Sequence, residues 1–582
     1  MIAPGLLILT LLEECAVELR GPRPGAAVTG RRSVHVYALA QVEGLPVPLN
    51  GMTMEFGGVP RRRGAKELAD RGEKMTTASQ PVRAGEYPLG VGRPPLHVAD
   101  LPTPEEVFQV GRTGPKETIT KIMGPAMIAL GLSIGSGEWL LGPQAIGSLG
   151  WTGVGFIITI SIVLQAFYNM EIGRYVVATG EVPSLGFGRV PPGAYVGTIL
   201  AVGLFYLAFI TGGWAASAGA SFFTMVTGDI PTGGDLTTTR WIGVGLMGAV
   251  FAITLFGKKI SRTLELLFWF LVLFILVTLL IAVLILTPPS AWLDGVVGMI
   301  QPALPPPGTE ATTIGAVAGF AAMASGLNYV FMNYYRDKGY GMGSKTGYIP
   351  GLLARGEHAP EIAPVGTTFR ETPENAARWR RWWGFLKLEM WAIFVPGAII
   401  GMLMPGILVS HLAEETGVKP TVASMPTYVA DQLRATGESS LFFGWALFIG
   451  FIILFKTQIV VFEMLTRNMV DALYGSSAWF RRLIAGDPRR FYYPFMIVLG
   501  VVISLIIFSA LPVTLVQWAA NMSNLAAMIF PFALMYLIGK LPRPARASLW
   551  SYLVLVLVAL FFGFFFVNFA ADQLTGSPLV TF

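Results

Sequence analysis

Charged residues are scarce in this chain: only 13% of its 582 residues are Asp, Glu, Lys or Arg, and 53% are hydrophobic. Soluble domains carry about 25% charged residues, so this composition predicts a polytopic membrane protein. The net charge of +6 is modest, and nothing in its distribution indicates a nucleic-acid partner. The expected surroundings of the chain are a lipid bilayer.

Cysteine and histidine are also rare. A single cysteine, Cys15, excludes an intramolecular disulfide and a cysteine metal cluster. The histidines His35, His97, His358 and His411 lie outside the long apolar runs, which argues against a histidine-ligated metal within the bilayer. HExxH, P-loop and GxSxG motifs are missing, so the sequence does not indicate an enzyme.

Long apolar runs dominate what is present. About twenty apolar residues are needed for a helix to cross the hydrocarbon core. Eleven such runs lie near residues 123–147, 153–178, 195–226, 240–257, 264–287, 312–333, 383–408, 440–464, 492–511, 513–538 and 548–570. We therefore expect an all-α protein with eleven transmembrane helices in the cell membrane.

The basic residues predict the orientation of these spans. With a cytoplasmic N-terminus, the cytoplasmic loops hold 22 Lys and Arg residues and the opposite loops hold 3. Cytoplasmic loops of membrane proteins are enriched in Lys and Arg, so this asymmetry predicts that the N-terminus is cytoplasmic.

The N-terminal region differs from the rest in composition. Residues 1–114 are rich in Pro, Gly and Arg, and we expect them to form a flexible cytoplasmic region before a transporter domain at 115–582. Residues 1–74 can also be interpreted as an extension upstream of a later start at Met75. Thr103, followed by Pro104 and Glu106, predicts the start of a helix.

Two apolar runs are interrupted by glycine and small polar residues. The first break (residues 134–139) reads Ile-Gly-Ser-Gly-Glu-Trp, and the second break (residues 323–328) reads Met-Ala-Ser-Gly-Leu-Asn. Unwound backbone at membrane depth is tolerated where it lines a cavity, and paired breaks in two halves of a chain indicate a transport site. The residues expected to bind substrate here are Gly135, Ser136, Gly137, Glu138, Ala322, Met323, Ser325 and Asn328.

Glu138 is the residue of the first break that most strongly indicates a function. An ionisable group in the middle of a span is costly and indicates function. A carboxylate there favours a cation, an amine or a proton. The alternative is that Glu138 is solvated at the outer end of a tilted helix. In the second break, Met323 offers a thioether to a transition metal, or it simply packs.

Three further polar features lie in later spans. Lys456 lies inside the eighth apolar run, where its charge can replace a coupling ion beside the first break, unless it extends to the cytoplasmic interface. Glu463 follows on the same helical face, so Glu138, Lys456 and Glu463 are the predicted proton- or ion-coupling residues. Asn521 and Asn524 mark a polar face of the tenth run, which fits substrate binding or helix–helix hydrogen bonding.

Several segments resemble the Nramp family of divalent-metal transporters. Residues 124–139, which begin Gly-Pro-Ala, are similar to that family's first span, which opens GPG and ends in a DPGNW motif. Residues 172–180 are similar to the RLGxVTG ending of its second helix. Residues 319–326 resemble its MPHN region, with Met323 at the methionine position, and residues 531–534 read PFAL as in its tenth span.

This resemblance implies eleven spans, a LeuT-type five-plus-five inverted repeat with broken first and sixth helices, and proton-coupled uptake of manganese or iron. Position by position, the family's ligand aspartate falls on Gly135 and its asparagine on Glu138. Its proline and histidine fall on Ala324 and Ser325. The chain therefore resembles a divergent, Nramp-related branch that lacks the DPGN and MPH motifs.

Taken together, these features predict a secondary transporter that moves a small cation inward by symport with protons. A divalent metal would be held by Glu138, by carbonyls near Ile134 and Ala322 and by the Met323 sulfur. Magnesium becomes the better candidate if oxygen ligands dominate. No resident cofactor is expected.

Two alternatives remain open. The Gly135-Ser136-Gly137 turn is similar to the GSG turn of amino-acid permeases, whose amides hold a substrate carboxylate, although Glu138 would repel such a group. An amino-acid or amine permease is therefore the alternative transporter. A scaffold or sensor with a decayed site is the alternative from another class.

Overall fold

The computed structural model describes residues 86–111, 114–122, 124, 125, 130, 134, 135, 137–255, 260–347, 363–420 and 424–582. Among these residues, ten helices are long and apolar enough to cross a membrane. They cover Val154–Thr179, Val196–Thr227, Gly233–Thr254, Trp269–Leu286, Ala311–Phe331, Pro373–Thr416, Ser440–Ser476, Arg489–Ile506, Pro512–Gly539 and Leu549–Thr575. Ten of the eleven predicted spans are thereby confirmed as helices of sufficient length.

The first predicted span is only partly described. Its second half begins with the π-helical turn η2 (Gly137–Leu141) and continues as α6 (Gly142–Leu149). Ser136, a predicted site residue, lies outside the described residues, as does the predicted extension 1–74.

The long helices that build the domain are bounded as follows: α7 (Val154–Thr179), α9 (Ala194–Phe209), α10 (Gly213–Thr227), α11 (Leu236–Leu255), α12 (Ile260–Leu286), α14 (Ala311–Phe320), α17 (Pro373–Glu389), α18 (Val395–Thr416), α20 (Ser440–Ser476), α22 (Arg489–Ile506), α23 (Pro512–Gly539) and α24 (Leu549–Thr575). Shorter elements are α3 (Pro104–Phe108), α4 (Pro115–Glu117), α8 (Pro183–Phe187), α13 (Pro289–Ile300), α15 (Asn328–Phe331), α16 (Asn333–Lys338), α19 (Met425–Ala435), α21 (Ala478–Leu483), β1 (His97–Ala99) and β2 (Thr367–Phe369).

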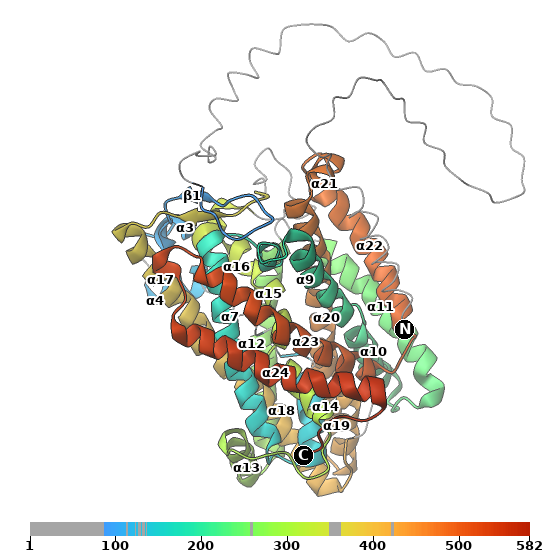
Figure 1. Cartoon of the computed structure of the whole chain (residues 1–582). Coiled ribbons are helices and arrows are strands. Elements are labelled where there is room, and N and C mark those ends of the chain that lie inside the picture. The colour runs from blue at the N-terminus through green and yellow to red at the C-terminus, as the bar shows by residue number, and fades with distance from the viewer. Residues whose placement is uncertain are drawn as a thin grey trace, which may run out of the picture. The chain divides into compact units, whose positions relative to one another are not determined.

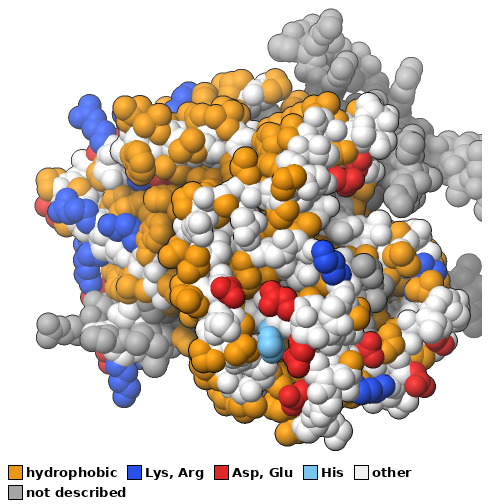
Figure 2. Space-filling model, turned by 90° about the horizontal axis from the view of Figure 1, so that it is seen from below, with side chains coloured by type: hydrophobic (Ala, Val, Ile, Leu, Met, Phe, Trp, Pro, Cys, Tyr) orange, Lys and Arg blue, Asp and Glu red, His pale blue; other side chains and the backbone are white. Residues whose placement is uncertain are grey.

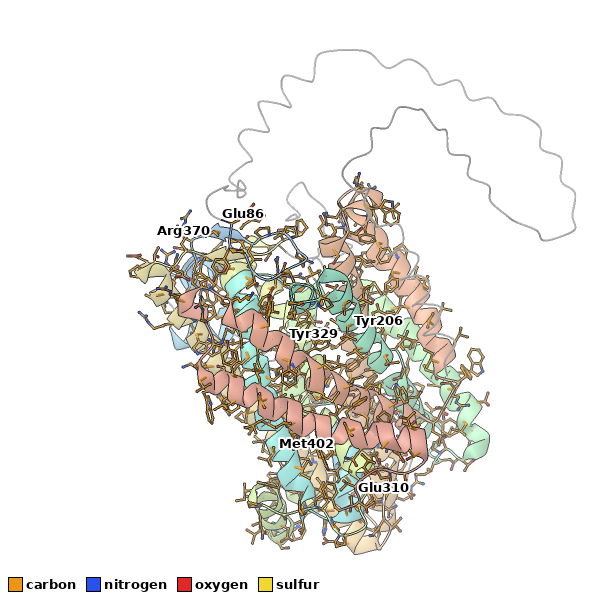
Figure 3. All side chains as sticks on the ribbon, viewed as in Figure 1. Glu86, Tyr206, Glu310, Tyr329, Arg370 and Met402 are labelled. Atoms are coloured by element: carbon orange, nitrogen blue, oxygen red, sulfur yellow. The ribbon has the colours of Figure 1, made fainter. Side chains whose placement is uncertain are left out.

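Loops predicted to lie on opposite sides of the membrane do lie at opposite ends of the helix bundle. Figure 1 shows β1 and α3 at one end and α13 at the other. In Figure 3, Arg370 lies at the first end and Glu310 near the second, with Tyr329 and Met402 between them. Figure 2 shows the second end, where Asp and Glu side chains gather near a histidine. Near the end of α18, His411 Nε2 lies 3.5 Å from Glu415 Oε2.

The third span is discontinuous, which the sequence analysis did not predict. Its run 195–226 forms two helices, α9 and α10, joined at Gly212, whose φ of 67° lies in the left-handed region that glycine favours. The Ala215 amide at the start of α10 donates to Gln458 Oε1 of α20 at 3.2 Å. A side-chain amide thereby replaces one of the hydrogen bonds that the interrupted helix lacks.

The segment before the first span is built into the domain. The predicted division into a flexible region 1–114 and a transporter domain 115–582 stays a prediction. β1 pairs in parallel with β2 from the loop between the sixth and seventh spans, with Val98 opposite Thr368. The predicted helix start at Thr103 is confirmed, because α3 begins there with a capping box in which Thr103 and Glu106 bond each other's backbone.

A buried charge cluster fixes this segment to the end of α7. The carboxylate of Glu181 accepts from Arg189 Nε at 2.7 Å and lies 3.3 Å from Arg93 Nη2. Burial raises the pKa of Glu181, but the two guanidinium groups outweigh that effect and lower it to about 2. Breaking such a buried pair leaves an uncompensated charge and is strongly destabilising.

We expect Glu181→Gln to lower the free energy of unfolding by on the order of 3 kcal/mol at pH 7. The pKa of Glu181 is about 2 in the folded protein against a reference value of 4.5, so its stabilisation is complete above pH 4.5 and disappears as the pH falls towards 2. Thermal unfolding in detergent from pH 7 to pH 2.5 should show the two proteins converging in acid. The exposed Glu374→Gln is the control, and a pH-independent difference would contradict the assignment.

Candidate functional site

The two predicted breaks lie against each other. Gly137 packs on the last residue of α14, so closely that an added Cβ would lie 1.8 Å from the Phe320 carbonyl oxygen. No side chain fits in that space, which explains why the first span has glycine at this position. The backbones of the first and sixth spans are therefore in contact close to the points where both helices are interrupted.

Glu138 is fully buried, with 0% of its surface exposed. Its Oε2 accepts a hydrogen bond from the Gly135 amide at 3.1 Å, which closes the first break on itself. The alternative of a solvated glutamate at the outer end of a helix is therefore not what the structure shows. Gly135 and Gly137 are buried beside it.

Lys456 reaches the first break from α20. Its side chain is 1% exposed, and its Nζ donates to the backbone carbonyl of Ile134. The Glu138 carboxylate acts electrostatically on the same ammonium. Lys456 does not extend to a membrane interface. Instead, its side-chain nitrogen binds a backbone carbonyl of the broken helix, four residues before Glu138.

The second break is held by α7, in a way that the sequence analysis missed. Gln165 Oε1 accepts from the Ser325 amide at 3.1 Å and from Asn328 Nδ2 at 3.3 Å. Ser161 Oγ donates to the Ala318 carbonyl at 2.6 Å. Two buried polar residues four positions apart in the apolar run 153–178 were the available signal, since that spacing marks one helical face.

Within the second break, the chain also caps its own backbone. Asn328 Oδ1 accepts from the Ala324 amide at 3.1 Å, and Ser325 has a φ of 38°. Ala322 and Met323 are buried in the unwound stretch between α14 and this cap. The sulfur of Met323 thus lies at the second break, as predicted, and its role as a metal ligand stays a prediction.

Asn521 and Asn524 take part in helix contacts. Asn524 Nδ2 donates to the Gly315 carbonyl at 2.9 Å and so joins α23 to α14. Asn521 Nδ2 donates to the Gln517 carbonyl of its own helix at 3.2 Å. The Asn524 bond fits the helix–helix alternative for the tenth span, and the role of both residues in substrate binding stays a prediction.

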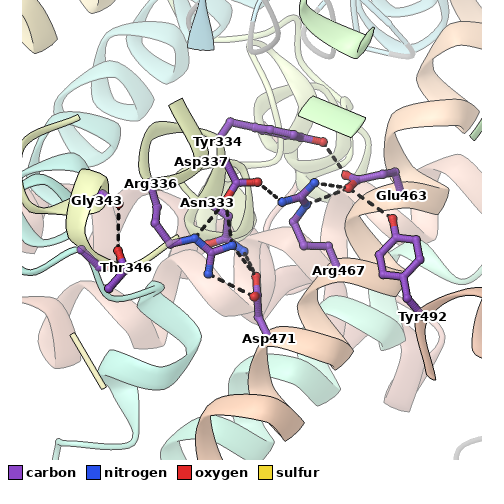
Figure 4. A network of polar contacts seen from close by, with 11 residues as sticks. Asn333, Tyr334, Arg336, Asp337, Gly343, Thr346, Glu463, Arg467, Asp471 and Tyr492 are labelled. Carbon is purple, nitrogen blue, oxygen red and sulfur yellow. Dashed lines mark hydrogen bonds and ion pairs between the residues drawn. The ribbon is translucent and has the colours of Figure 1, made fainter. Parts of the chain in front are cut away.

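Glu463 belongs to a different cluster from Lys456. It lies seven residues further along α20, a rise of about 10 Å. Its carboxylate binds Arg467 Nε at 2.7 Å and the Tyr334 hydroxyl at 2.6 Å (Figure 4). The predicted role of Glu463 in proton or ion coupling, together with Glu138 and Lys456, stays a prediction.

Acidic ligands are few at the breaks. The described residues contain no group of three or more His, Cys, Asp or Glu side chains that could hold a metal ion. A metal bound beside Glu138 would therefore need backbone carbonyls or the Met323 sulfur as its remaining ligands. Such a donor set favours ions that accept mixed oxygen and sulfur coordination.

The contact between the breaks gives a direct test. We expect Gly137→Ala to lower the free energy of unfolding by about 3 kcal/mol, because the new methyl group overlaps the Phe320 carbonyl and both helices must move. Gly248→Ala in α11 is the matched control, since its Cβ would meet nothing within 4 Å. Thermal unfolding in detergent measures both. Equal stability of the two variants would show that the breaks do not touch.

Comparison with known proteins gives structural similarity only. No protein-family model matches the sequence, and no curated protein matches it. Among solved structures, the chain is similar to the Eremococcus coleocola manganese transporter in complex with an aromatic bis-isothiourea compound, with 14% identity, 85% of this chain and 92% of that chain covered, and a TM-score of 0.50. It is also similar to MhsT in complex with L-phenylalanine, with 15% identity, 76% and 97% coverage, and a TM-score of 0.48.

The first of these similarities confirms the predicted fold class. The chain is a polytopic, all-α membrane protein of the LeuT type, with an Nramp-like arrangement of its spans.

Proposed function

We propose that this protein is a secondary transporter that moves a small cation across the membrane, with a divalent metal ion such as manganese, iron or magnesium as the first candidate and with coupling to protons. The observation that carries this proposal is the fully buried Glu138 carboxylate at the first break, where the Ile134 carbonyl accepts a hydrogen bond from the buried Lys456. Unwound carbonyls and carboxylates at such breaks favour cations.

A lysine side chain already binds at the first break, and this shapes the proposal. Two cations close to one carboxylate repel each other strongly in a medium of low dielectric constant. A transported cation therefore binds Glu138 in place of the Lys456 ammonium. Glu138 is the proposed cation ligand, and Glu138 and Lys456 together are the proposed coupling residues.

The acidic end of the domain supports a cation as well. Asp and Glu side chains gather on that face in Figure 2. Glu414 and Glu415 lie in the last turn of α18, and Glu310 lies directly before α14. Surface potentials of one sign raise the local concentration of ions of the opposite sign. This end of the molecule would therefore attract cations towards the breaks.

Uptake into proteoliposomes tests the proposal. The purified protein is reconstituted and offered Mn²⁺, Fe²⁺ and Mg²⁺, each with and without an inward proton gradient. We expect uptake of at least one ion above that of empty liposomes, faster with the gradient. Suppose that none of the three ions is taken up but an amine or amino acid is. The cation-transport proposal would then be wrong, and an amino-acid or amine permease would take its place.

A second candidate, an amino-acid or amine permease, is favoured by one specific observation. The sequence argument against it was that Glu138 repels a substrate carboxylate. Lys456 binds the Ile134 carbonyl in the same break, and a protonated Lys456 there would reduce this repulsion. Methylamine and glycine therefore belong in the same uptake panel as the metal ions.

A further inference from the structure

The connection between the eighth and ninth spans is basic and exposes apolar side chains. It consists of α21, the turn after it and the start of α22, and Figure 1 shows it at the end of the helix bundle that carries β1. Residues 478–490 hold four arginines and one aspartate, which gives this connection a net positive charge. The proposed transport site does not include it.

Two of the four arginines are bound within the protein. Arg489 forms an ion pair with Asp487, in which the Nε–Oδ1 and Nη2–Oδ2 distances are both 2.9 Å. Arg481 is directed back to α20, where its Nη1 donates to the Tyr474 carbonyl. These two side chains therefore stabilise the connection itself.

The other two arginines, Arg482 and Arg490, are exposed, and neither forms an ion pair with a described residue. Arg482 Nε donates to the Ala478 carbonyl of its own helix at 3.3 Å. A guanidinium presents five N–H donors in a planar fork that fits the oxygens of a phosphate group. Both side chains are therefore available to an anion from outside the protein.

Apolar side chains accompany Arg482 on the surface of α21. Trp479 is 59% exposed and Leu483 is 62% exposed. They lie three residues before and one residue after Arg482, so the three side chains neighbour each other on the helix. The buried Phe480 fixes this arrangement, because its ring packs edge-on against Phe491 of α22 with the centroids 5.0 Å apart. The exposed face of α21 is thus both apolar and basic.

The lipid-facing side of α22 leads to the same place. Its exposed apolar side chains are Ile497, Val498, Val501 and Leu505, and each is more than half exposed. Arg490 lies seven residues before Ile497, nearly two helical turns, and therefore on the same side of the helix at its beginning. A charged side chain on a lipid-facing surface lies at the level of the headgroups, so this side of α22 reaches the membrane boundary at Arg490.

We propose that the basic corner (Trp479, Arg482, Leu483 and Arg490) binds the headgroup of an anionic phospholipid. The lipid phosphate accepts hydrogen bonds from the two arginines, while Trp479 and Leu483 contact the glycerol and the first part of the acyl chains. Tryptophan is enriched at this depth because its ring is amphipathic, and basic side chains there are attracted to anionic lipids. A lipid fits better than a soluble anion because half of the corner is apolar. The inference does not rest on the proposed transport function.

Native mass spectrometry of the detergent-purified full chain tests the proposal. The protein is titrated with palmitoyl-oleoyl phosphatidylglycerol, or with the phosphatidylcholine that has the same acyl chains. We expect the first phosphatidylglycerol to bind at least about tenfold more tightly, since each basic side chain near an anionic lipid contributes about fivefold to the affinity. The double variant Arg482→Gln with Arg490→Gln should reduce this preference to about twofold or less. Both residues are exposed, so we expect the variant to unfold at the wild-type temperature.

A matched control separates a site from general attraction by positive charge. Lys540→Gln with Arg543→Gln removes two exposed positive charges from the end of the domain where Tyr87 and Glu371 contact the same loop. This pair should keep the wild-type preference for phosphatidylglycerol. Inorganic phosphate added in excess over the lipid should not displace it, because phosphate lacks the acyl chains.

Fluorescence quenching measures the depth of the corner independently. Cys15→Ser removes the single cysteine, and Leu483→Cys or Val501→Cys then carries a fluorophore in reconstituted protein. Lipids spin-labelled at the headgroup should quench the label at position 483 at least about twofold more than lipids labelled at the end of the acyl chain. The label at position 501 should show the reverse.

Retention of the preference by the folded Arg482/Arg490 double variant would overturn the proposal. So would an equal loss of preference in the Lys540/Arg543 control, because the lipid would then respond to total charge alone. Displacement of the lipid by inorganic phosphate would make the corner a site for a soluble anion and the lipid assignment wrong. Absence of quenching at position 483 by either lipid would place α21 in water and contradict the proposal as well.

Discussion

Replacing Glu138 by Gln is expected to lower the initial rate of cation uptake by about 100-fold or more, which corresponds to about 2.7 kcal/mol of lost binding. The carboxylate is the only negative charge that the structure places at the first break among the described residues, and a neutral amide cannot compensate a bound cation. Initial uptake rates in proteoliposomes measure the loss.

Lost uptake could also reflect lost folding, because the variant leaves the Lys456 ammonium buried without its carboxylate. Removing one partner of a buried pair costs about 3–5 kcal/mol of stability. The double variant Glu138→Gln with Lys456→Met removes both charges, and we expect it to unfold near the wild-type temperature while still failing to transport. Wild-type uptake by the double variant would show that Glu138 is not the cation ligand.

Replacing Lys456 by Met is expected to have the opposite effect on binding. With the resident ammonium gone, Glu138 and the Ile134 carbonyl are available to an added ion, so we expect Mn²⁺ to bind at least about tenfold tighter to the variant than to the wild type. Isothermal titration calorimetry of the detergent-solubilised proteins measures this. Uptake by the variant should no longer respond to a proton gradient, because Lys456 is a proposed coupling residue.

A lysine elsewhere in the chain provides the control. Lys419 Nζ also donates to a backbone carbonyl of the first span, that of Ser148, at 2.9 Å, but this hydrogen bond is exposed to solvent. Lys419→Met should bind Mn²⁺ as the wild type does. If Lys456→Met binds no metal and loses glycine or methylamine uptake instead, the ammonium is part of a permease site and the second candidate function holds.

Hydropathy along the chain was sufficient to predict the spans, because crossing a bilayer depends on the local length and polarity of each segment. Ten of the eleven predicted runs are helices long enough to cross. The first break was also predictable, because two glycines and a glutamate inside an apolar run disfavour a continuous helix and a purely apolar environment. The helix start at Thr103 was predictable because the residues of its capping box, Thr103 and Glu106, lie within four positions of each other.

Other features of the structure could not be predicted from the local sequence. The break in the third span involves Gly212 in a run that is otherwise apolar, and its stabilising partner, Gln458, is 243 positions away from Ala215. Residues 86–111 belong to the region that we expected to be flexible. Nothing in their composition indicates that β1 pairs with a strand 270 residues later in the chain. The glutamate at position 463 shares a helical face with Lys456 but binds another helix.

Sequence by itself therefore determined the class of the molecule, its spans and the presence of a carboxylate where a helix is interrupted. Only the tertiary structure decided what each buried polar group faces. Lys456 meets the Ile134 carbonyl across 322 positions, and Gln165 meets the Ser325 amide across 160. The physical reason is that burial of a charge or amide can be predicted locally from its apolar neighbours, whereas the partner that compensates it is chosen by packing between distant helices.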